Sequence, residues 1–534
     1  MKCFKSLSAS LLALISGFFF VGCETEESPF TGLRLSGANC YVAAGESVEL
    51  TAVFVKEDKE NKSAEITWTL IKDTTGGASL TAVSPLSGQS VNLSNGQSVS
   101  LLSGQSATFT AGSTEGGLCG ITVSYENYSV TAYIGVEETK ISADDIPTGF
   151  AGKGWESDAS NIVEVSSRSE LMAAVKSGQK IIYVISSIDM TDTGAGTMLP
   201  SVNYDSVPST LDAFVNEKTS GAYSTYADWK KAYGNGCDSS INDSNGKSPH
   251  SGFYDTMRTL NQAYANIITV KVLSNTTIIG VPDSNGNAPV IKGGRFSISS
   301  SNVIIRNLVF QDACDPFTHH EANDGFNAQF DCIAVSGANH VWIDHCTLED
   351  TKKLIYAANG EKWQVYDGLC DITNTSSYVT VSNCIFRNHD KTSLIGNGES
   401  DIYGGQITLA CNRFYGCGQR LPLLCYPEMH IYNNYYGDET GFYSNSYAIG
   451  ARYAAFTVIA EGNYFGSGIS NAFNASTKAG GECYASGNST NSGSLSTTSS
   501  KPFEVPYSYM LLSYSEAKNY VKSHAGAGKL PVSK

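Results

Sequence analysis

Five apolar segments in the second half of the chain share one pattern, and this pattern restricts the fold more than any other feature of the sequence. The segments begin at residues 303, 341, 379, 407 and 429 and read VIIRNLVF, VWIDHCTL, VTVSNCIF, ITLACNRF and MHIYNNYY. Their starts are 38, 38, 28 and 22 residues apart. A unit of about 22 residues with variable insertions is typical of a parallel β-helix, in which each unit forms one coil of a stack. The alternative, a β-sandwich with coincidentally similar strands, does not explain the shared register.

Polar or small side chains occupy the fifth place of every segment. We expect them to stack coil upon coil and to hydrogen-bond to one another, as amide side chains do in Asn ladders. His345, although it follows Asp344, is therefore predicted to belong to this stack and not to a catalytic dyad. The segments NTTIIGVPD and FTVIAEGNYF, which begin at 275 and 456, extend the stack at its two ends. The fifth-place residues are Asn307, His345, Asn383, Cys411 and Asn433.

The N-terminus predicts export from a bacterial cell. Lys2 and Lys5 precede an apolar run from residue 11 to residue 21, which is too short to span a bilayer and indicates a signal peptide. The run ends in FVGC, which resembles a bacterial lipobox, so we predict a lipoprotein signal peptide at residues 1–22 and a lipid anchor at Cys23. Ordinary cleavage near an incidental cysteine is the alternative. The acidic residues after Cys23 resemble surface-export signals, so we expect a secreted lipoprotein at the surface of the outer membrane.

Residues 32–138 show the alternation of short antiparallel strands. In SVELTAVFV the side chains of Val48, Leu50, Ala52 and Phe54 share one face, and GITVSYENYSVTAYIGV is typical of a hairpin. A region of this length made of such strands predicts an immunoglobulin-like β-sandwich. It resembles bacterial Ig-like modules that space a catalytic domain from the cell surface. A spacer is the expected role, and a ligand-binding role stays open.

The charge and the cysteines exclude two classes of function. A net charge of −16 argues against nucleic acid as a partner. The 14 cysteines form no CxxC pair, which argues against a zinc site, and several of them lie at strand positions, where cysteine acts as a small apolar residue. We expect a monomer.

Five charged residues are predicted to lie at about the same angular position on successive coils. Counted back from the start of the next apolar segment, Asp331 lies ten residues before it, Asp367 twelve, Asp371 eight and Arg420 nine. Lys391 lies sixteen residues before its segment, and the stretch NGESDIYGG can absorb the excess. Because adjacent strands are about 4.8 Å apart, an acidic patch should lie beside a basic one on one face of the stack.

The three acids are candidate ligands for a metal ion. Asp367 and Asp371 would lie more than about 13 Å apart in a straight strand. They can share an ion only if the chain bends between them, which Gly368 permits, and Asp331 would add a third carboxylate from the coil below. Three hard oxygen ligands suit Ca²⁺, with water and substrate completing its coordination. Three solvated surface acids are the alternative.

Seven motifs place the chain near a known family. They are TGFAGKGW at 148, NTTIIG at 275, NVIIRNLVF at 302, VWIDHC at 341, NHDKTSLIG at 388, QRLPLL at 419 and EGNYF at 461. In this order they resemble the pectate lyase family, the parallel β-helix polysaccharide lyases. The resemblance implies an all-β fold, a right-handed parallel β-helix over residues 147–534. An insertion at about 190–265 interrupts it, in which TYADWKKAYG predicts a short helix closed by Gly234.

The resemblance also implies a reaction and its residues. It implies calcium-dependent cleavage of de-esterified homogalacturonan, or polygalacturonate, by β-elimination to unsaturated oligogalacturonides. Asp331, Asp367 and Asp371 match the family's calcium ligands, Lys391 matches the donor to the substrate carboxylate, and Arg420 matches the base. A guanidinium holds its proton tightly, so a second role for Arg420, as a clamp on the substrate carboxylate, stays open.

Two positions depart from the family pattern. The family often has an acid where this chain has Gln329, which puts one calcium subsite in doubt, and commonly a second arginine where it has Cys425, which puts a substrate contact in doubt. Two other functions therefore remain. One is a pectin lyase acting on methyl-esterified chains, although such enzymes typically lack the calcium acids. The other is a non-catalytic pectin-binding lipoprotein, against which the retained Lys391 and Arg420 argue.

Overall fold

The computed structural model of the chain contains two compact units. The N-terminal unit is Met1–Thr139 with Ser508–Leu512, and the β-helix unit is Lys140–Tyr507 with Ser513–Lys534. The predicted signal peptide and Cys23 lie outside the described residues. No helix among the described residues is long and apolar enough to cross a membrane. The structure describes residues 32–55, 66–85, 90–92, 98–100, 103–200, 207–237, 251–321, 324–353, 356–358, 360–398, 401, 403–452, 456–475, 481–489 and 500–534.

Two four-stranded sheets form the core of the N-terminal unit. Their strand pairs are antiparallel except β2 with β10, which is parallel. Leu50, Phe109, Ile121 and Ile134 come from both sheets and share one buried core, as the alternating pattern predicts. The predicted hairpin turns at Glu126, which has a φ of 51°. The first sheet contains β1 (Gly32–Ser36), β3 (Ser47–Val55), β8 (Ser103–Thr110) and β5 (Ser79–Pro85); the second contains β2 (Cys40–Val42), β10 (Tyr128–Val136), β9 (Leu118–Tyr125) and β4 (Thr67–Ile71); β6 (Ser90–Asn92) and β7 (Ser98–Ser100) pair separately.

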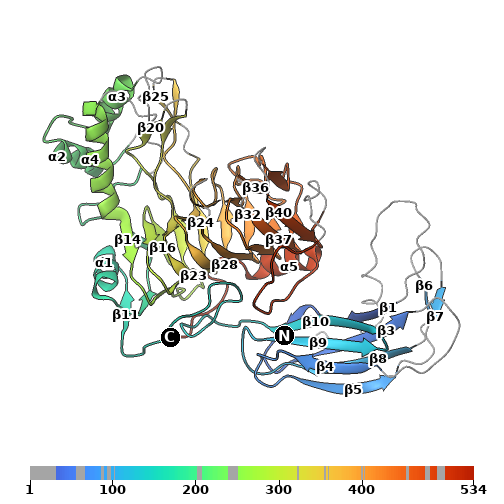
Figure 1. The fold of residues 1–534 in the computed structure, drawn as a ribbon. Coiled ribbons are helices and arrows are strands. Elements are labelled where there is room, and N and C mark those ends of the chain that lie inside the picture. Colours follow the sequence, from blue (N-terminus) through green and yellow to red (C-terminus); the bar gives the residue numbers. More distant parts are fainter. Residues whose placement is uncertain are drawn as a thin grey trace, which may run out of the picture. The chain divides into compact units, whose positions relative to one another are not determined.

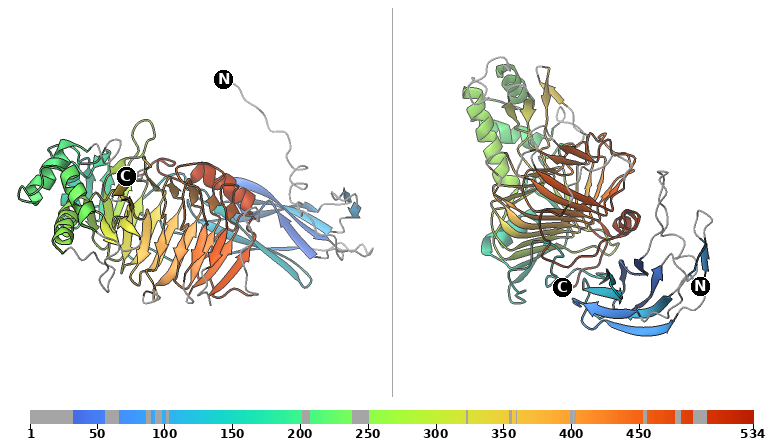
Figure 2. Two further views of the ribbon diagram at one scale, coloured as in Figure 1. Left: turned by 90° about the horizontal axis from the view of Figure 1, so that it is seen from above. Right: turned by 45° about the vertical axis from the view of Figure 1, so that its right-hand side comes forward.

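Three long parallel sheets form the β-helix unit, and successive strands stack coil on coil (Figures 1 and 2). Sheet I contains β11 (Ile162–Val165), β12 (Ile181–Val184), β15 (Thr276–Gly280), β18 (Val303–Arg306), β23 (Asn339–Asp344), β28 (Ser377–Ser382), β31 (Gly405–Ala410), β34 (Met429–Tyr432), β37 (Thr457–Glu461) and β40 (Glu482–Ser486). Sheet II contains β13 (Ile188–Asp189), β16 (Val290–Lys292), β19 (Val309–Gln311), β24 (Thr347–Glu349), β29 (Ile385–Arg387), β32 (Arg413–Tyr415), β35 (Tyr435–Tyr436) and β38 (Tyr464–Phe465). Sheet III contains β14 (Thr269–Val272), β17 (Arg295–Ile298), β22 (Ile333–Ser336), β27 (Cys370–Thr373), β30 (Leu394–Ile395), β33 (Leu423–Leu424), β36 (Ile449–Ala451) and β39 (Phe473–Ala475).

The register of sheet I is the one that the five segments predict. Val303 pairs with Val341, and the pairing continues through Val379 and Ile407 to Met429. The two predicted end segments, at β15 and β37, pair with this series as well. The core inside the coils is apolar, and in sheet II it includes an aromatic stack with ring centroids 4.7–4.9 Å apart. The stacked rings are Phe386, Phe414, Tyr436 and Phe465.

The hydrogen-bonded ladder lies one place later than predicted. At the fifth place the backbone takes a left-handed conformation, with φ between 47° and 57°, which Asn and His tolerate better than most residues. His345 and Asn383 there bond to Asp344 and not along a ladder. The ladder runs through the sixth place, where each side-chain oxygen accepts from the backbone N–H of the coil before it, at 2.9–3.0 Å. Its members are Asn412, Asn434, Asn463 and Asn488.

The insertion forms a helical lobe that the sequence predicts only in small part. The predicted short helix is α3, which runs to Gly236 and is not closed at Gly234. Three helices and one small sheet pack here around an aromatic core that includes Trp229, Phe317 and Trp363 (Figure 1). The lobe contains α2 (Ser209–Lys218), α3 (Tyr226–Gly236), α4 (Ser251–Ile268), β20 (His319–Glu321), β21 (Gly325–Asn327), β26 (Glu361–Trp363) and β25 (Tyr356–Ala358); outside it lie α1 (Arg168–Ser177) and α5 (Tyr514–His524).

We expect Asn434→Ala to lower the free energy of unfolding by about 2–4 kcal/mol, because it removes hydrogen bonds to buried backbone groups of the preceding coil. Asn434 accepts from the backbone N–H of Asn412 and donates to the Leu409 carbonyl, at 2.9 Å each. Chemical denaturation measures the change. Asn266→Ala, at an exposed position of α4, is the control and should change stability by less than about 0.5 kcal/mol. Equal effects of the two substitutions would contradict the ladder's role.

Candidate active site

Sheet III brings the five predicted site residues together on successive coils. Asp331 lies two residues before β22, Asp371 lies in β27, and Lys391 and Arg420 lie shortly before β30 and β33. These four strands are neighbours in the sheet, and Lys391 forms a parallel bridge with Gln419, next to Arg420. Within β27, Cys370 and Ile372 belong to the interior core, so Asp371 between them lies on the outer face. The site is therefore a row of charges across the strands.

Gly368 is the point where two of the carboxylates meet. A Cβ at this position would lie 2.4 Å from Oδ1 of Asp371 and 2.8 Å from Oδ1 of Asp331, closer than real Cβ atoms approach other heavy atoms. The two oxygens therefore occupy the space that a side chain would fill. The sequence predicts a bend at Gly368, but the stronger reason for glycine here is the close approach of Asp331 and Asp371.

Each acid has a different partner within the protein. Oδ1 of Asp331 accepts from the backbone N–H of Gly368 at 3.0 Å, and Oδ1 of Asp371 accepts from that of Leu394 at 2.9 Å. The carboxylate of Asp367 forms an ion pair with Lys391, with Nζ 3.0 Å from Oδ1. Asp331 and Asp371 thus have no paired cation at ion-pair distance within the described chain.

The raised pKa values of the acids indicate that this arrangement lacks a cation. Burial and, to a smaller extent, the charge of Asp367 raise the pKa of Asp331 to about 6. The pKa of Asp371 is raised well above its usual value by burial and by the charges of Asp331 and Asp367. The charge of Arg420 acts in the opposite direction on Asp371. Clustered carboxylates that resist ionisation in this way are stabilised by a cation that all of them can share.

Arg420 lies on the coil that follows the coil of Lys391, and its charge acts on Asp371. Its φ of 63° is unusual for an arginine, and its carbonyl accepts from the backbone N–H of Ser393 at 2.9 Å, which fixes the backbone beside Lys391. Among the described residues its guanidinium has no ion-pair partner, and its Nε is buried without a hydrogen bond. The Arg420 side chain lies against the hydroxyl of Tyr447. Arg420 is half-buried, and a partly desolvated guanidinium without an ion-pair partner favours an anionic ligand.

Comparison with known proteins gives this site its family. A profile described as "Pectate lyase" matches residues 240–530. A pectate lyase from Bacillus subtilis is 33% identical over 411 residues, which cover 72% of this chain and 90% of that protein. The chain belongs to the pectate lyase family. It is a pectate lyase and hence a polysaccharide lyase.

Other relatives and solved structures agree with this assignment. Pectate lyase D from Dickeya chrysanthemi is 34% identical over 289 residues, 49% of this chain and 72% of that protein. The structure of a mutant Bacillus subtilis pectate lyase superposes with a TM-score of 0.59 at 27% identity, covering 73% of this chain and 98% of the other. The structure of a pectate lyase bound to a hexasaccharide gives a TM-score of 0.57 at 27% identity, covering 72% and 97%.

Several residues around the lyase site are absent from the sequence prediction. His389 donates from Nε2 to the carbonyl of Asp367 at 2.7 Å, and its Nδ1 lies 2.7 Å from the carboxylate of Asp350. Arg295 lies in the coil before Asp331, and its charge opposes the rise in the pKa of that acid. His389 lies two residues before Lys391 in the motif NHDKTSLIG, so this motif could have identified His389 as a site residue from the sequence. Nothing in the local sequence singles out Arg295.

Asp315 is a fourth acid near the cluster, and α4 of the helical lobe holds it. Its carboxylate accepts from Nδ2 of Asn261 at 3.0 and 3.1 Å and from the backbone N–H of Phe317 and Gln329. Burial raises its pKa to about 7. Asp315 and Asn261 therefore connect the lobe to the loop that leads into Asp331.

The structure shows the surroundings of Gln329 and Cys425, the two residues that depart from the family pattern. The backbone of Gln329 accepts from Arg295 and donates to Asp315, so this residue contributes its main chain to the site. Cys425 is buried, and its Sγ occupies the space beside Gly396, 2.2 Å from where a Cβ would lie. A thiol in that position cannot reach a substrate carboxylate in the way that an arginine would.

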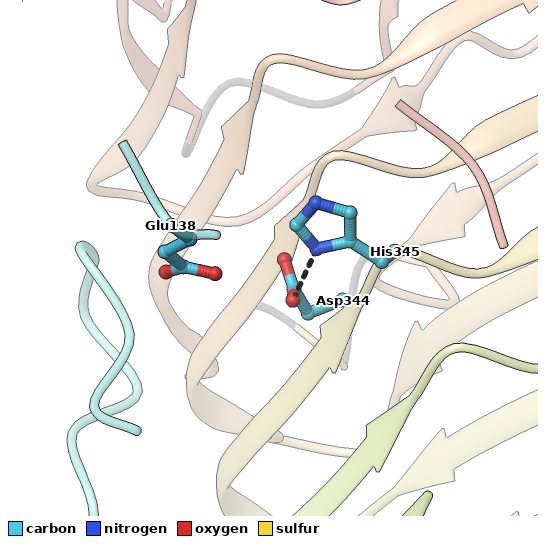
Figure 3. Close-up of side chains that lie close together, drawn as sticks. All are labelled: Glu138, Asp344 and His345. Carbon is cyan, nitrogen blue, oxygen red and sulfur yellow. Dashed lines mark hydrogen bonds and ion pairs between the residues drawn. The ribbon is translucent and has the colours of Figure 1, made fainter. Parts of the chain in front are cut away.

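Asp344 and His345 belong to a structural network of the lyase. Figure 3 shows their hydrogen bond, from Nδ1 to Oδ2 at 2.6 Å. The same carboxylate accepts from Arg306 at 2.6 and 2.9 Å and from Ser382 at 2.6 Å. Burial alone would raise the pKa of Asp344, but the charges of His345 and Arg306 hold it well below its usual value. The prediction that His345 stacks in a ladder is wrong, because its partner is the buried Asp344.

We expect Gly368→Ala to weaken Ca²⁺ affinity by at least about tenfold, because the new Cβ would force the carboxylates of Asp331 and Asp371 apart. Isothermal titration calorimetry measures the affinity, and circular dichroism checks the fold. Gly252→Ala is the control, because nothing lies within 4 Å of a Cβ there. Unchanged affinity in folded Gly368→Ala would show that these two carboxylates do not share the ion.

We expect Ca²⁺ affinity to fall by about tenfold or more from about pH 8 to about pH 5. The pKa of Asp331, raised to about 6, and the raised pKa of Asp371 mean that protons compete with the ion for these oxygens as the pH falls. Calorimetry near pH 6 in buffers of different ionisation enthalpy should detect protons released on binding. Binding without proton release at that pH would contradict the raised pKa of Asp331.

Proposed function

We propose that this pectate lyase is calcium-dependent and cleaves de-esterified homogalacturonan by β-elimination to unsaturated oligogalacturonides. The observation that carries the proposal is the row of charges on sheet III. Carboxylates from two adjacent coils converge on Gly368, and Lys391 and Arg420 follow on the next two coils. A polyanion laid across the strands would meet a bound cation and two basic side chains in succession.

The donor set supports calcium. Asp331, Asp367 and Asp371 offer only carboxylate oxygens, the ligands that Ca²⁺ prefers, and the absent side chain at Gly368 leaves room for those of Asp331 and Asp371 to converge. These three residues would hold the ion. When bound, calcium would supply Lewis-acid stabilisation of the negative charge that develops on the substrate carboxylate.

Lys391 and Arg420 would carry out the remaining chemistry. The proton at C5 is acidified by the neighbouring carboxylate, and Lys391 stabilises that carboxylate by donating a hydrogen bond as charge develops. Arg420 would first release a guanidinium proton to solvent, and the C5–H bond would then break as the freed nitrogen takes the C5 proton and the guanidinium re-forms. The electron pair forms the C4–C5 double bond, the C4–O bond breaks, and the leaving oxygen takes a proton from solvent.

One assay separates this function from its two rivals. The unsaturated product is followed by ultraviolet absorbance on polygalacturonate and on methyl-esterified pectin, each with calcium or with a chelator. The proposal requires activity on polygalacturonate that the chelator abolishes. Activity on esterified pectin in chelator would instead identify a pectin lyase, and no product on either substrate would identify a pectin-binding protein.

We also propose how the remaining parts of the chain serve the enzyme. Residues 147–534 would form the lyase domain, with coils of right-handed sense because parallel crossovers are almost always right-handed. Residues 32–138 would form an Ig-like spacer, for which the two packed four-stranded sheets are the support. Lipidation of Cys23 would anchor a secreted, monomeric enzyme at the outer-membrane surface, near polymeric substrate.

We expect Arg420→Lys to lose at least about a hundredfold in kcat, because lysine keeps the charge but loses the planar guanidine that would take the proton. Steady-state kinetics on polygalacturonate at saturating calcium measure kcat and KM separately. Arg413→Lys is the matched control, since Arg413 pairs with Glu439 at 2.8 Å and lies outside the site row. If Arg420→Lys keeps its kcat and only its KM rises, Arg420 is a clamp and another group takes the proton.

A further inference from the structure

His389 joins two segments of the site that lie on neighbouring coils. Its Nε2 donates to the backbone carbonyl of Asp367 at 2.7 Å. Two residues further along the chain, Lys391 pairs with the carboxylate of the same residue, with Nζ 3.0 Å from Oδ1. The segment 389–391 therefore contacts Asp367 at both its main chain and its side chain. The position of this candidate calcium ligand depends on the orientation of His389.

Asp350 fixes the orientation of the His389 ring. Nδ1 lies 2.7 Å from Oδ2 of Asp350, and each of the two side chains is 2% exposed. Nε2 uses its hydrogen for the carbonyl of Asp367, so the second hydrogen lies between Nδ1 and the carboxylate, whichever of the two atoms carries it. The ring cannot turn without breaking both hydrogen bonds in a region that excludes water.

The other contacts of Asp350 leave it no second role. Its Oδ1 is buried and has no hydrogen bond to any residue that the structure describes. Buried carboxylates that serve stability have their oxygens satisfied, since an unsatisfied oxygen costs free energy. Orientation of His389 is therefore the function that these contacts assign to Asp350.

The residue before Asp367 is fixed to the same stretch of chain as His389. The hydroxyl of Tyr366 donates to Oδ1 of Asp312 at 3.1 Å. The carboxylate of Asp312 also accepts from the backbone N–H and the hydroxyl of Thr351, at 2.8 and 2.6 Å. Residues 350 and 351 thus hold both residues that lead into Gly368, each through one intermediate side chain. The carboxylate of Asp367 itself remains partly exposed.

We propose that Asp350 and His389 form a positioning pair, which holds the main chain of Asp367 so that its carboxylate reaches an ion shared by Asp331 and Asp371. The proposal rests on the proposed function, because it takes Asp367 to be a calcium ligand. His389 is buried and acts through the carbonyl of Asp367. Hydrogen-bond partners of this kind, which orient the ligands of a metal, typically contribute about 10- to 100-fold to its affinity.

The test is isothermal titration calorimetry of the full chain with Ca²⁺, with His389→Asn and His389→Gln. The asparagine amide takes the place of Nδ1, so it keeps a partner for Asp350 and loses the bond to Asp367. The glutamine amide takes the place of Nε2 and keeps that bond. We expect His389→Asn to weaken Ca²⁺ affinity by at least about tenfold and His389→Gln by less than about threefold.

The matched control is His320→Asn in the helical lobe. His320 is also buried, and its Nε2 lies 2.7 Å from the carboxylate of Glu361, but it has no contact with the site row. This variant should bind Ca²⁺ with wild-type affinity. At saturating calcium the kcat of His389→Asn on polygalacturonate should return to within about threefold of wild type, because excess ion compensates for a misplaced ligand. A damaged fold would lower kcat at every calcium concentration.

Two outcomes would overturn the positioning pair. One is wild-type Ca²⁺ affinity in folded His389→Asn, and the other is an equal loss of affinity in His389→Asn and His389→Gln. If His389→Asn does not fold, Asp350→Asn and Asp350→Leu decide. Asp350→Asn keeps a hydrogen bond to Nδ1 and should keep the affinity, whereas Asp350→Leu removes that bond and should weaken it. Equal affinities in these two variants would overturn the pair.

Failure of the proposed function gives a different result. A wild-type chain that binds Ca²⁺ but does not cleave polygalacturonate would refute the proposed reaction, and the measured affinities would still test the positioning pair. A wild-type chain that binds no Ca²⁺ would refute the calcium site and the positioning pair together.

Discussion

The structure depends on the fixed register of parallel coils. Once Val303, Val341 and Val379 pair in sheet I, the angular position of every other residue in those coils follows from its distance along the chain. Residues at one angular position then lie about one strand spacing apart, whether or not their charges are compatible. For Asp331 and Asp371 the result is two half-buried carboxylates whose pKa values are raised. Under the proposed function, a shared divalent cation would relieve this repulsion.

Register is also the reason that much of the architecture could be predicted from sequence. Segments with a shared apolar pattern identify sheet I, and counting back from them places Asp331, Asp371, Lys391 and Arg420 on neighbouring coils of sheet III. The ladder shows the limit of such counting, because two effects favour asparagine at adjacent places. Left-handed backbone favours it at the fifth place, whereas buried hydrogen bonding requires it at the sixth, as at Asn434.

The remaining parts of the site could not be read from local pattern, because they depend on contacts between distant segments. Asn261 on α4 reaches Asp315 only after the insertion folds as a lobe. His389 acts on the carbonyl of Asp367, which no side-chain pattern reveals. Tyr447 occupies its place because Gly450, one coil beyond Arg420, lacks a side chain. In the last two cases a backbone group or a missing side chain makes the contact, and neither produces periodicity.

The central claim is that stacked coils assemble one calcium site from Asp331, Asp367 and Asp371. The most direct measurement is the anomalous scattering of calcium in crystals grown with Ca²⁺ and an oligogalacturonate, using the slow Arg420→Lys variant. The account predicts a peak about 2.3–2.6 Å from carboxylate oxygens of all three residues, with a substrate carboxylate completing the coordination. A peak bound to other residues, or no peak beside Gly368 at saturating calcium, would contradict it.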